Sequence, residues 1–166
     1  STQGVSSAAS DVYKRQHEKL GSKERQVYLV YGPPLAGKRT YVDKAMNKGD
    51  LIVDIDSIWE CVSGLSRYEK PPRLKAVVFA MHKALVESVR YRQGKWSNAY
   101  IIGGYPLQGE RERLAKELGA REILVRATKE ECLNRLEVSE DARNKTDWTR
   151  FIEEWFERYA PPLDEN

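Results

Sequence analysis

The 166-residue sequence predicts an α/β fold of three layers, with a short parallel sheet of about four strands between helices. Two observations predict it. Short runs rich in β-branched and aromatic residues alternate with helical patterns, which is typical of right-handed βαβ units. The first run is apolar almost throughout, as a strand covered on both faces is. We find no internal repeat and no second domain.

The elements follow in order from these patterns. Strands are expected at 26–32, 51–55, 99–104 and 121–127. Helices are expected from 38 onward, at 57–62, at about 72–93, at 109–118 and at about 129–138, and a last helix ends before 161. An apolar stripe at helical spacing marks the long helix: Leu74, Val77, Val78, Met81, Leu85 and Val89. Another stripe marks the last helix, and we interpret it as core packing and not as a base-stacking platform: Trp148, Phe151, Ile152, Trp155, Phe156 and Tyr159.

One domain is expected over 25–162, with a tail at 163–166. Residues 1–24 are expected to be a disordered leader, because the segment is small, polar and aperiodic and buries too little apolar area to offset its ordering entropy. This leader also resembles translated adapter sequence from assembled environmental reads, which would make it foreign to the native gene.

Composition excludes several classes of function. The formal net charge is +3, but five cations and three anions fall in residues 1–25, so the remainder is close to +1. Strong binding of duplex nucleic acid is therefore not expected. No apolar run approaches the roughly 20 residues that span a bilayer, so no membrane role is expected. Two widely separated cysteines without metal-ligand spacing suggest a reduced, cytoplasmic setting.

The central motif is a loop of the form G-x-x-x-x-G-K, directly after an expected strand and before an expected helix. It comprises Gly32, Pro33, Pro34, Leu35, Ala36, Gly37 and Lys38. Backbone N–H groups and the helix N-terminus would bind an anion, and the lysine would reach the β- and γ-phosphates. The bare pattern arises by chance in roughly one chain in twenty. The flanking strand and helix favour a phosphate loop over an ordinary turn, and hence binding of a nucleoside triphosphate, with ATP expected.

One position departs from this pattern. After the lysine, Ser or Thr normally supplies a hydroxyl ligand for Mg²⁺, but this chain has Arg39, and Thr40 follows one residue later. Thr40 is expected to reach an α-phosphate rather than the metal. Arg39 either points outward or contacts phosphate. Mg²⁺, the expected cofactor beside ATP, must then depend on other groups.

These residues resemble the small P-loop kinases. The resemblance covers about 26–160 and rests on YGPPLAGKRTYV, a strand ending in Asp-x-Asp, Gly-Tyr-Pro after the third strand, and LVRATKEECLNRL. The nearest likeness is to phage-type ATP-binding proteins related to polynucleotide kinases, with gluconate, shikimate and nucleoside-monophosphate kinases as cousins. The resemblance implies a P-loop NTPase fold of the αβα type and ATP-dependent phosphotransfer.

Asp54 and Asp56 are the acidic pair of this resemblance. It implies that Asp56 lies near the acceptor hydroxyl as a general base or orienting group, and Asp54 near Mg²⁺ or its waters. Strand alternation would put both on one side of the second strand, at the edge where ligands bind. The alternative is that Asp56 only caps the following helix.

Further site residues come from position. Gly104 and Tyr105 are expected to line the acceptor cleft, and Gly103 replaces an acid that a motor-type ATPase would need. Three arginines are candidates to balance transferring charge: Arg135 near the adenine or phosphates, Arg143 in a lid, and Arg67 at an acceptor phosphate. Each has the alternative of a solvated surface arginine.

Three functions remain. The first is a phosphotransferase that moves the γ-phosphate of ATP to a hydroxyl or phosphate of a nucleoside, nucleotide or polynucleotide end. The second is a nucleotide-binding module with little or no turnover, favoured by Arg39 and Gly103. A packaging or remodelling ATPase is least expected. Family likeness alone favours a polynucleotide 5′ end as acceptor, whereas the near-neutral charge favours a small nucleotide.

Overall fold

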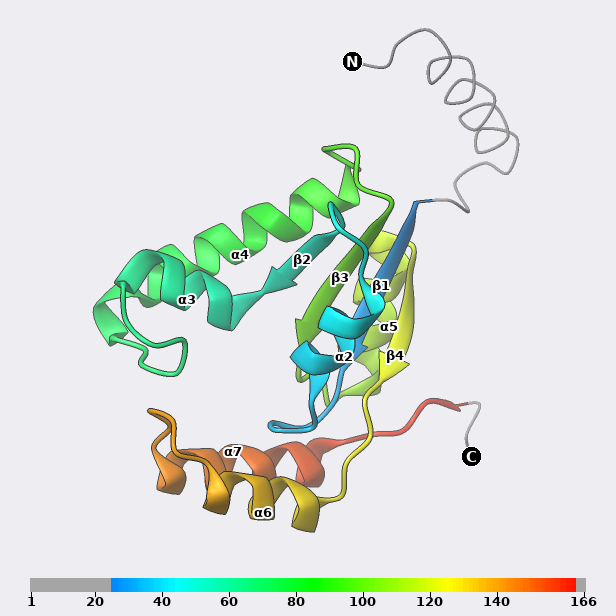
Figure 1. Ribbon diagram of the computed structural model, residues 1–166. Coiled ribbons are helices and arrows are strands. Elements are labelled where there is room, and N and C mark those ends of the chain that lie inside the picture. The colour runs from blue at the N-terminus through cyan, green and yellow to red at the C-terminus, as the bar shows by residue number, and fades with distance from the viewer. Residues whose placement is uncertain (1–24, 164–166) are drawn as a thin grey trace, which may run out of the picture.

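A four-stranded parallel sheet forms the centre of the computed structural model, which describes residues 25–163. Its strands are β1 (Gln26–Tyr31), β2 (Leu51–Asp54), β3 (Asn98–Gly103) and β4 (Ala120–Leu124), in the order β2-β3-β1-β4. The expected α/β class and strand number are confirmed (Figure 1). The interpretations of residues 1–24 as a leader and of 164–166 as part of a tail lie outside the described residues.

Helices cover both faces of this sheet. On one face, Val89 of α4 (Lys75–Arg90) and Leu118 of α5 (Gln108–Leu118) belong to a core cluster with inward residues of β1, β2 and β3. On the other face, Val42 of α2 (Lys38–Ala45) packs with Val30 of β1 and with side chains of β3. The connections from β1 and from β3 therefore leave the sheet on opposite faces and run toward opposite edges.

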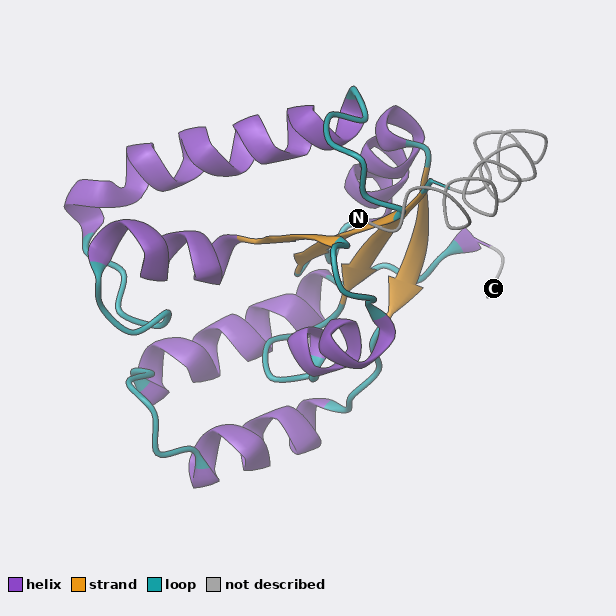
Figure 2. Ribbon diagram, turned by 45° about the horizontal axis from the view of Figure 1, so that its top comes forward, coloured by secondary structure: helices purple, strands orange, loops and turns teal. Residues whose placement is uncertain are grey.

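Two helical pairs extend beyond the sheet. The short α3 (Ile55–Ser63) follows β2 directly and packs against α4. A three-residue 3-10 helix, η2 (Pro72–Leu74), leads into α4. The helices α6 (Lys129–Val138) and α7 (Lys145–Arg158) pack on each other beyond the carboxyl ends of the strands (Figures 1 and 2). In the described part of the chain, no helix has the length and apolar character that crossing a bilayer requires.

The strand register brings the ends of all four strands to one edge. Tyr31 at the end of β1 lies opposite Gly103 of β3 and Leu124 of β4, and Asp54 at the end of β2 lies opposite Ile102. The loops that follow these strands therefore begin at the same level. Because the β1 and β3 connections diverge, the crevice between these two strands is the switch point at which parallel α/β sheets bind ligands.

Two sequence-based expectations are wrong, one about the buried face of α4 and one about the position of Asp56. In α4, Val78 and Val89 are buried, but Val77 and Met81 of the expected apolar stripe are exposed. The second strand ends at Asp54, and α3 begins at Ile55, so Asp56 belongs to a helix and not to the same side of a strand as Asp54. The reason is a competing helix start, because the Asp54 side chain accepts a hydrogen bond from the backbone N–H of Asp56.

Candidate functional site

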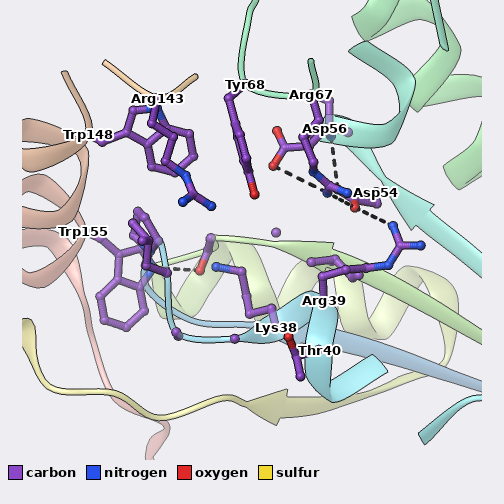
Figure 3. Close-up of a pocket in the computed structure, with 18 residues that line it drawn as sticks. Lys38, Arg39, Thr40, Asp54, Asp56, Arg67, Tyr68, Arg143, Trp148 and Trp155 are labelled. Atoms are coloured by element: carbon purple, nitrogen blue, oxygen red, sulfur yellow. Dashed lines mark hydrogen bonds and ion pairs between the residues drawn. The ribbon is translucent and has the colours of Figure 1, made fainter. Parts of the chain in front are cut away.

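A cavity of about 540 Å³ opens at the carboxyl edge of the sheet, within the size range of small-molecule sites (Figure 3). It lies between the loop after β1, the start of α3, the segment 64–71, the end of β3 and the helix α7. Its lining residues are Pro34, Leu35, Ala36, Gly37, Lys38, Arg39, Thr40, Asp54, Ile55, Asp56, Arg67, Tyr68, Ile102, Gly103, Gly104, Arg143, Trp148 and Trp155.

The loop Gly32–Lys38 forms one wall of this cavity, and its shape requires glycine at two positions. A Cβ at Gly32 would lie 2.5 Å from the carbonyl oxygen of Val125, so the loop begins in close contact with the chain after β4. Gly37 has φ +94° and is the N-cap of α2, a conformation that side chains rarely adopt. Leu35 has φ +62° without being glycine. Such strained residues concentrate at ligand sites.

Lys38 begins α2 and turns back across the loop. Its Nζ donates to the carbonyl oxygens of Gly32 and Pro33, both at 2.8 Å. Burial lowers the pKa of the ammonium to about 8, although the charges of Asp56 and Asp54 oppose the shift. The lysine is thus held at the cavity by weak carbonyl partners, from which an anion could draw it.

Asp54 is the most enclosed charge of the site, with 5% of its surface exposed. Its Oδ1 accepts the Asp56 N–H, and its Oδ2 accepts from Arg39 and the Ser57 hydroxyl and pairs with Arg67. Burial raises the pKa of this carboxyl, but the hydrogen bonds from Arg67 and Arg39 outweigh it and leave the pKa below its usual value. Both carboxylate oxygens are therefore occupied by donors from the protein.

Arg39 turns toward Asp54 and not outward, and its contact with phosphate stays a prediction. Its Nη1 donates to Asp54 at 2.9 Å (Figure 3). The same Nη1 donates to Ser57 and its Nε donates to Asp43, also at 2.9 Å each. A guanidinium thus fills the space beside Asp54 where a Mg²⁺ ion would need oxygen ligands. Within the described residues, no group of three or more His, Cys, Asp or Glu side chains could hold a metal. Asp54 and Arg39 therefore do not fit the oxygen ligands that Mg²⁺ requires.

Asp56 faces the same cavity but is engaged differently. Its Oδ1 lies 2.8 Å from Nζ of Lys70, and its Oδ2 lies 3.9 Å from Nη2 of Arg67. Since Asp54 is the N-cap of α3, the interpretation of Asp56 as that cap is wrong. Asp56 therefore keeps a carboxylate at the cavity, balanced by two cations.

Arg67 and Arg143 both line the cavity, as expected of candidate phosphate-binding residues. Arg143 pairs with Asp141 at 2.7 Å, and its guanidinium carbon lies 3.9 Å from the centroid of the Tyr68 ring and 4.8 Å from that of Trp148. The Nε atoms of Arg67 and Arg143 are buried and have no hydrogen-bond partner among the described residues. Both guanidinium groups thus have spare donors.

The aromatic stripe of α7 corrects an expectation in part. Ile152 and Trp155 are buried, but Trp155 also lines the cavity together with Trp148, and Phe151 is exposed. Together with Tyr68, whose ring centroid lies 5.5 Å from that of Trp148, these tryptophans form an aromatic side of the cavity (Figure 3). The stripe is therefore not core packing alone. Helical spacing located the face, but it could not show that a cavity lies against it.

Of the other residues expected at the site, two line the cavity and two do not. Gly104 lines the cavity and accepts a hydrogen bond from Trp155 at 2.8 Å, and the exposed Thr40 lies at its edge. Tyr105 does not line it, because φ +40° turns its ring back over Gly103 and against the core. Arg135 also lies outside the lining, and its Nη1 donates instead to the Leu35 carbonyl at 2.8 Å, supporting the loop from behind.

Sequence reasoning missed four side chains that shape the site. Tyr68, Lys70, Trp148 and Trp155 were not assigned to it. For the first two, the only signal was their position in SGLSRYEKPP, close after the acidic pair. For the tryptophans, the signal was their position on the helix that follows the expected lid arginine, Arg143.

Comparison with known proteins adds no assignment. No protein-family model matches the chain, and no curated protein sequence matches it significantly. The geometry of the cavity therefore has to carry any functional conclusion.

Proposed function

We propose that this chain binds the phosphates of ATP in the loop Gly32–Thr40. It then transfers the γ-phosphate to a hydroxyl or phosphate of a nucleoside, a nucleotide or a polynucleotide end. The observation that carries the proposal is the position of Lys38, whose ammonium lies at a cavity of suitable volume with the Asp56 carboxylate across from it. A cation for the donor phosphates and a carboxylate for the acceptor are the minimum set for this reaction.

Loop geometry supports phosphate binding. A strand, a glycine-bounded loop and a helix follow one another without interruption, and the helix N-terminus at Lys38 borders the cavity. Backbone N–H groups at such a terminus favour an anion. The site also lies at the point where the β1 and β3 connections diverge. These are the features expected of a P-loop, and they support an assignment to that fold.

The transfer can be written with the residues at hand. The acceptor hydroxyl attacks the γ-phosphorus, the bond from that phosphorus to the β-bridging oxygen breaks, and ADP leaves. Asp56 orients the hydroxyl and takes its proton as the new bond forms. Lys38 stabilises the negative charge on the β- and γ-phosphates. Arg67 and Arg143 stabilise the negative charge on the transferring group or on an acceptor phosphate.

The aromatic side of the cavity favours a nucleobase on the acceptor. Tyr68, Trp148 and Trp155 line the cavity, and a planar nucleobase can stack on such rings or contact their edges. A base would meet the ring edges or displace Arg143, whose guanidinium lies over the rings of Tyr68 and Trp148. The aromatic lining therefore supports a nucleoside, nucleotide or polynucleotide end as acceptor.

A second function is favoured by the ion pairs of the acidic residues. Asp54 is saturated by protein donors, and Asp56 is paired with Lys70. A nucleotide-binding module with little or no turnover would not require either carboxylate to be free of protein partners. In that case the loop would bind ATP, and added acceptors would not raise the rate of ADP release.

ADP release over a panel of nucleoside, nucleotide and 5′-hydroxyl oligonucleotide acceptors tests the proposal. At least one acceptor should raise the rate, and Asp56→Asn should abolish that increase while ATP binding persists. Glu117→Gln, which neutralises an exposed carboxyl on α5, should leave the rate unchanged. ADP release that ignores every acceptor, with ATP still bound, would favour the module. Failure to bind ATP would refute both.

A further inference from the structure

The cation that balances phosphate charge in this cavity need not be a metal. Mg²⁺ requires near-octahedral oxygen ligands, usually one or two carboxylates with water and phosphate oxygens. Both oxygens of Asp54 already accept hydrogen bonds, Oδ1 from the Asp56 N–H at the start of α3 and Oδ2 from two arginines and Ser57. At the position of the usual hydroxyl ligand, the chain has Arg39.

The charge of the cavity points the same way. Four cationic side chains and the two carboxylates of Asp54 and Asp56 line it, and with the ion-paired neighbours Asp43, Lys70 and Asp141 the local net charge is +1. The cations are Lys38, Arg39, Arg67 and Arg143. A divalent cation would enter a cavity that is already positive, whereas a triphosphate without its metal would be attracted.

Hydrogen bonding distinguishes an anion from a cation here. The buried Nε atoms of Arg67 and Arg143 lack acceptors among the described residues, and leaving such donors unpaired is costly. Arg39 uses Nε and Nη1 for its contacts with Asp43, Asp54 and Ser57, and no contact among the described residues uses its Nη2. The Nη2 atom of Arg39 could donate to a phosphate oxygen, whereas a metal ion offers no acceptor to any of these guanidinium groups.

We propose that Arg39 and Arg67, held on the shared carboxylate of Asp54, take the place of the divalent cation, so that the chain binds the metal-free form of a nucleoside triphosphate. The inference rests on the proposed function of the Gly32–Thr40 loop and names the form of the donor that it accepts. Asp54 acts as a positioning residue, because it fixes both guanidinium groups beside the loop. Planar guanidinium forks suit phosphate oxygens at such short range.

Calorimetric titration with ATP, in EDTA and again in excess Mg²⁺, tests this inference. For the natural chain, we expect the two dissociation constants to agree within roughly a factor of three. Arg39→Ser restores the usual hydroxyl and removes one guanidinium. It should weaken binding in EDTA about tenfold or more and make binding tighter in Mg²⁺ than in EDTA.

A matched control is Arg90→Ser, which removes an arginine of similar exposure at the end of α4 that forms an ion pair with Glu87, away from the cavity. It should behave as the natural chain does in both buffers. If the natural chain binds ATP about tenfold or more tightly with Mg²⁺, the inference is wrong while the proposed function stands. Absence of ATP binding in both buffers would instead overturn the proposed function.

Discussion

The Nζ atom of Lys38 lies 2.8 Å from the carbonyl oxygen of Gly32, the first residue of its own loop. This contact closes the loop into a ring and holds the ammonium at the cavity edge. Because burial lowers the pKa of Lys38 to about 8, the charge that meets the phosphates is lost within an accessible pH range.

ATP binding should therefore weaken at alkaline pH. A bound anion raises the pKa of Lys38, so binding takes up protons above about pH 8, and affinity is full below that pH and falls above it. Between pH 7 and pH 9 the dissociation constant should rise about tenfold, measured by calorimetry. Lys38→Arg stays charged throughout, so its affinity should change little over the same interval. An equal loss in Lys38→Arg would place the titrating group elsewhere.

Tryptophan fluorescence should report phosphate binding through Trp148. The Arg143 guanidinium lies against the rings of Tyr68 and Trp148, and a phosphate would draw it away and change the surroundings of the indole. Titration with ATP should change the emission of the natural chain, and Trp148→Phe should remove most of that change. Trp96→Phe is the control, since Trp96 is buried near the amino ends of the strands. A response lost equally in both variants would contradict the assignment.

Two glycine substitutions should have opposite effects on stability. In Gly32→Ala, the new Cβ would meet the Val125 carbonyl at 2.5 Å, and neither backbone can yield without moving the loop or β4. We expect a loss of about 2–3 kcal/mol in urea unfolding. Gly109→Ala places a methyl group in open space on α5 and should gain about 0.5–1 kcal/mol from helix propensity. If Gly32→Ala unfolds like Gly109→Ala, the close approach is not a constraint.

Local patterns account for what could be predicted of the fold. Apolar runs located all four strands, and the glycine spacing located the loop before α2, because both signals lie within a few neighbouring residues. Interactions between distant segments could not be read in this way. The capping of α3 by Asp54 moved Asp56 off the strand, and the positive φ of Tyr105 turned its ring away from the cavity.

Arg111 is the clearest case of a residue that its local pattern misrepresents. In QGERERL it reads as one more charge on the solvent face of a helix, yet its side chain is fully buried. Its guanidinium donates to the carbonyls of Tyr105, Pro106 and Ala160, pairs with Glu122 at 3.2 Å, and lies 4.4 Å from the centroid of the Tyr31 ring. One side chain thus ties the turn after β3 to the chain that follows α7.

Arg111→Met should therefore destabilise the protein far more than a surface substitution would. Removing the guanidinium leaves the half-buried carbonyls of Tyr105 and Ala160 without this donor and Glu122 without its partner, while Pro106 keeps the Ala160 N–H. The expected cost is about 4 kcal/mol and roughly 12 °C in Tm. Arg113→Met, two residues along the same helix at an exposed position, should shift Tm little. Limited proteolysis gives a second measurement, since release of Ala160 should expose the end of α7 to cleavage before global unfolding. Equal melting temperatures for the two variants would mean that Arg111 does not hold the cavity wall to the sheet.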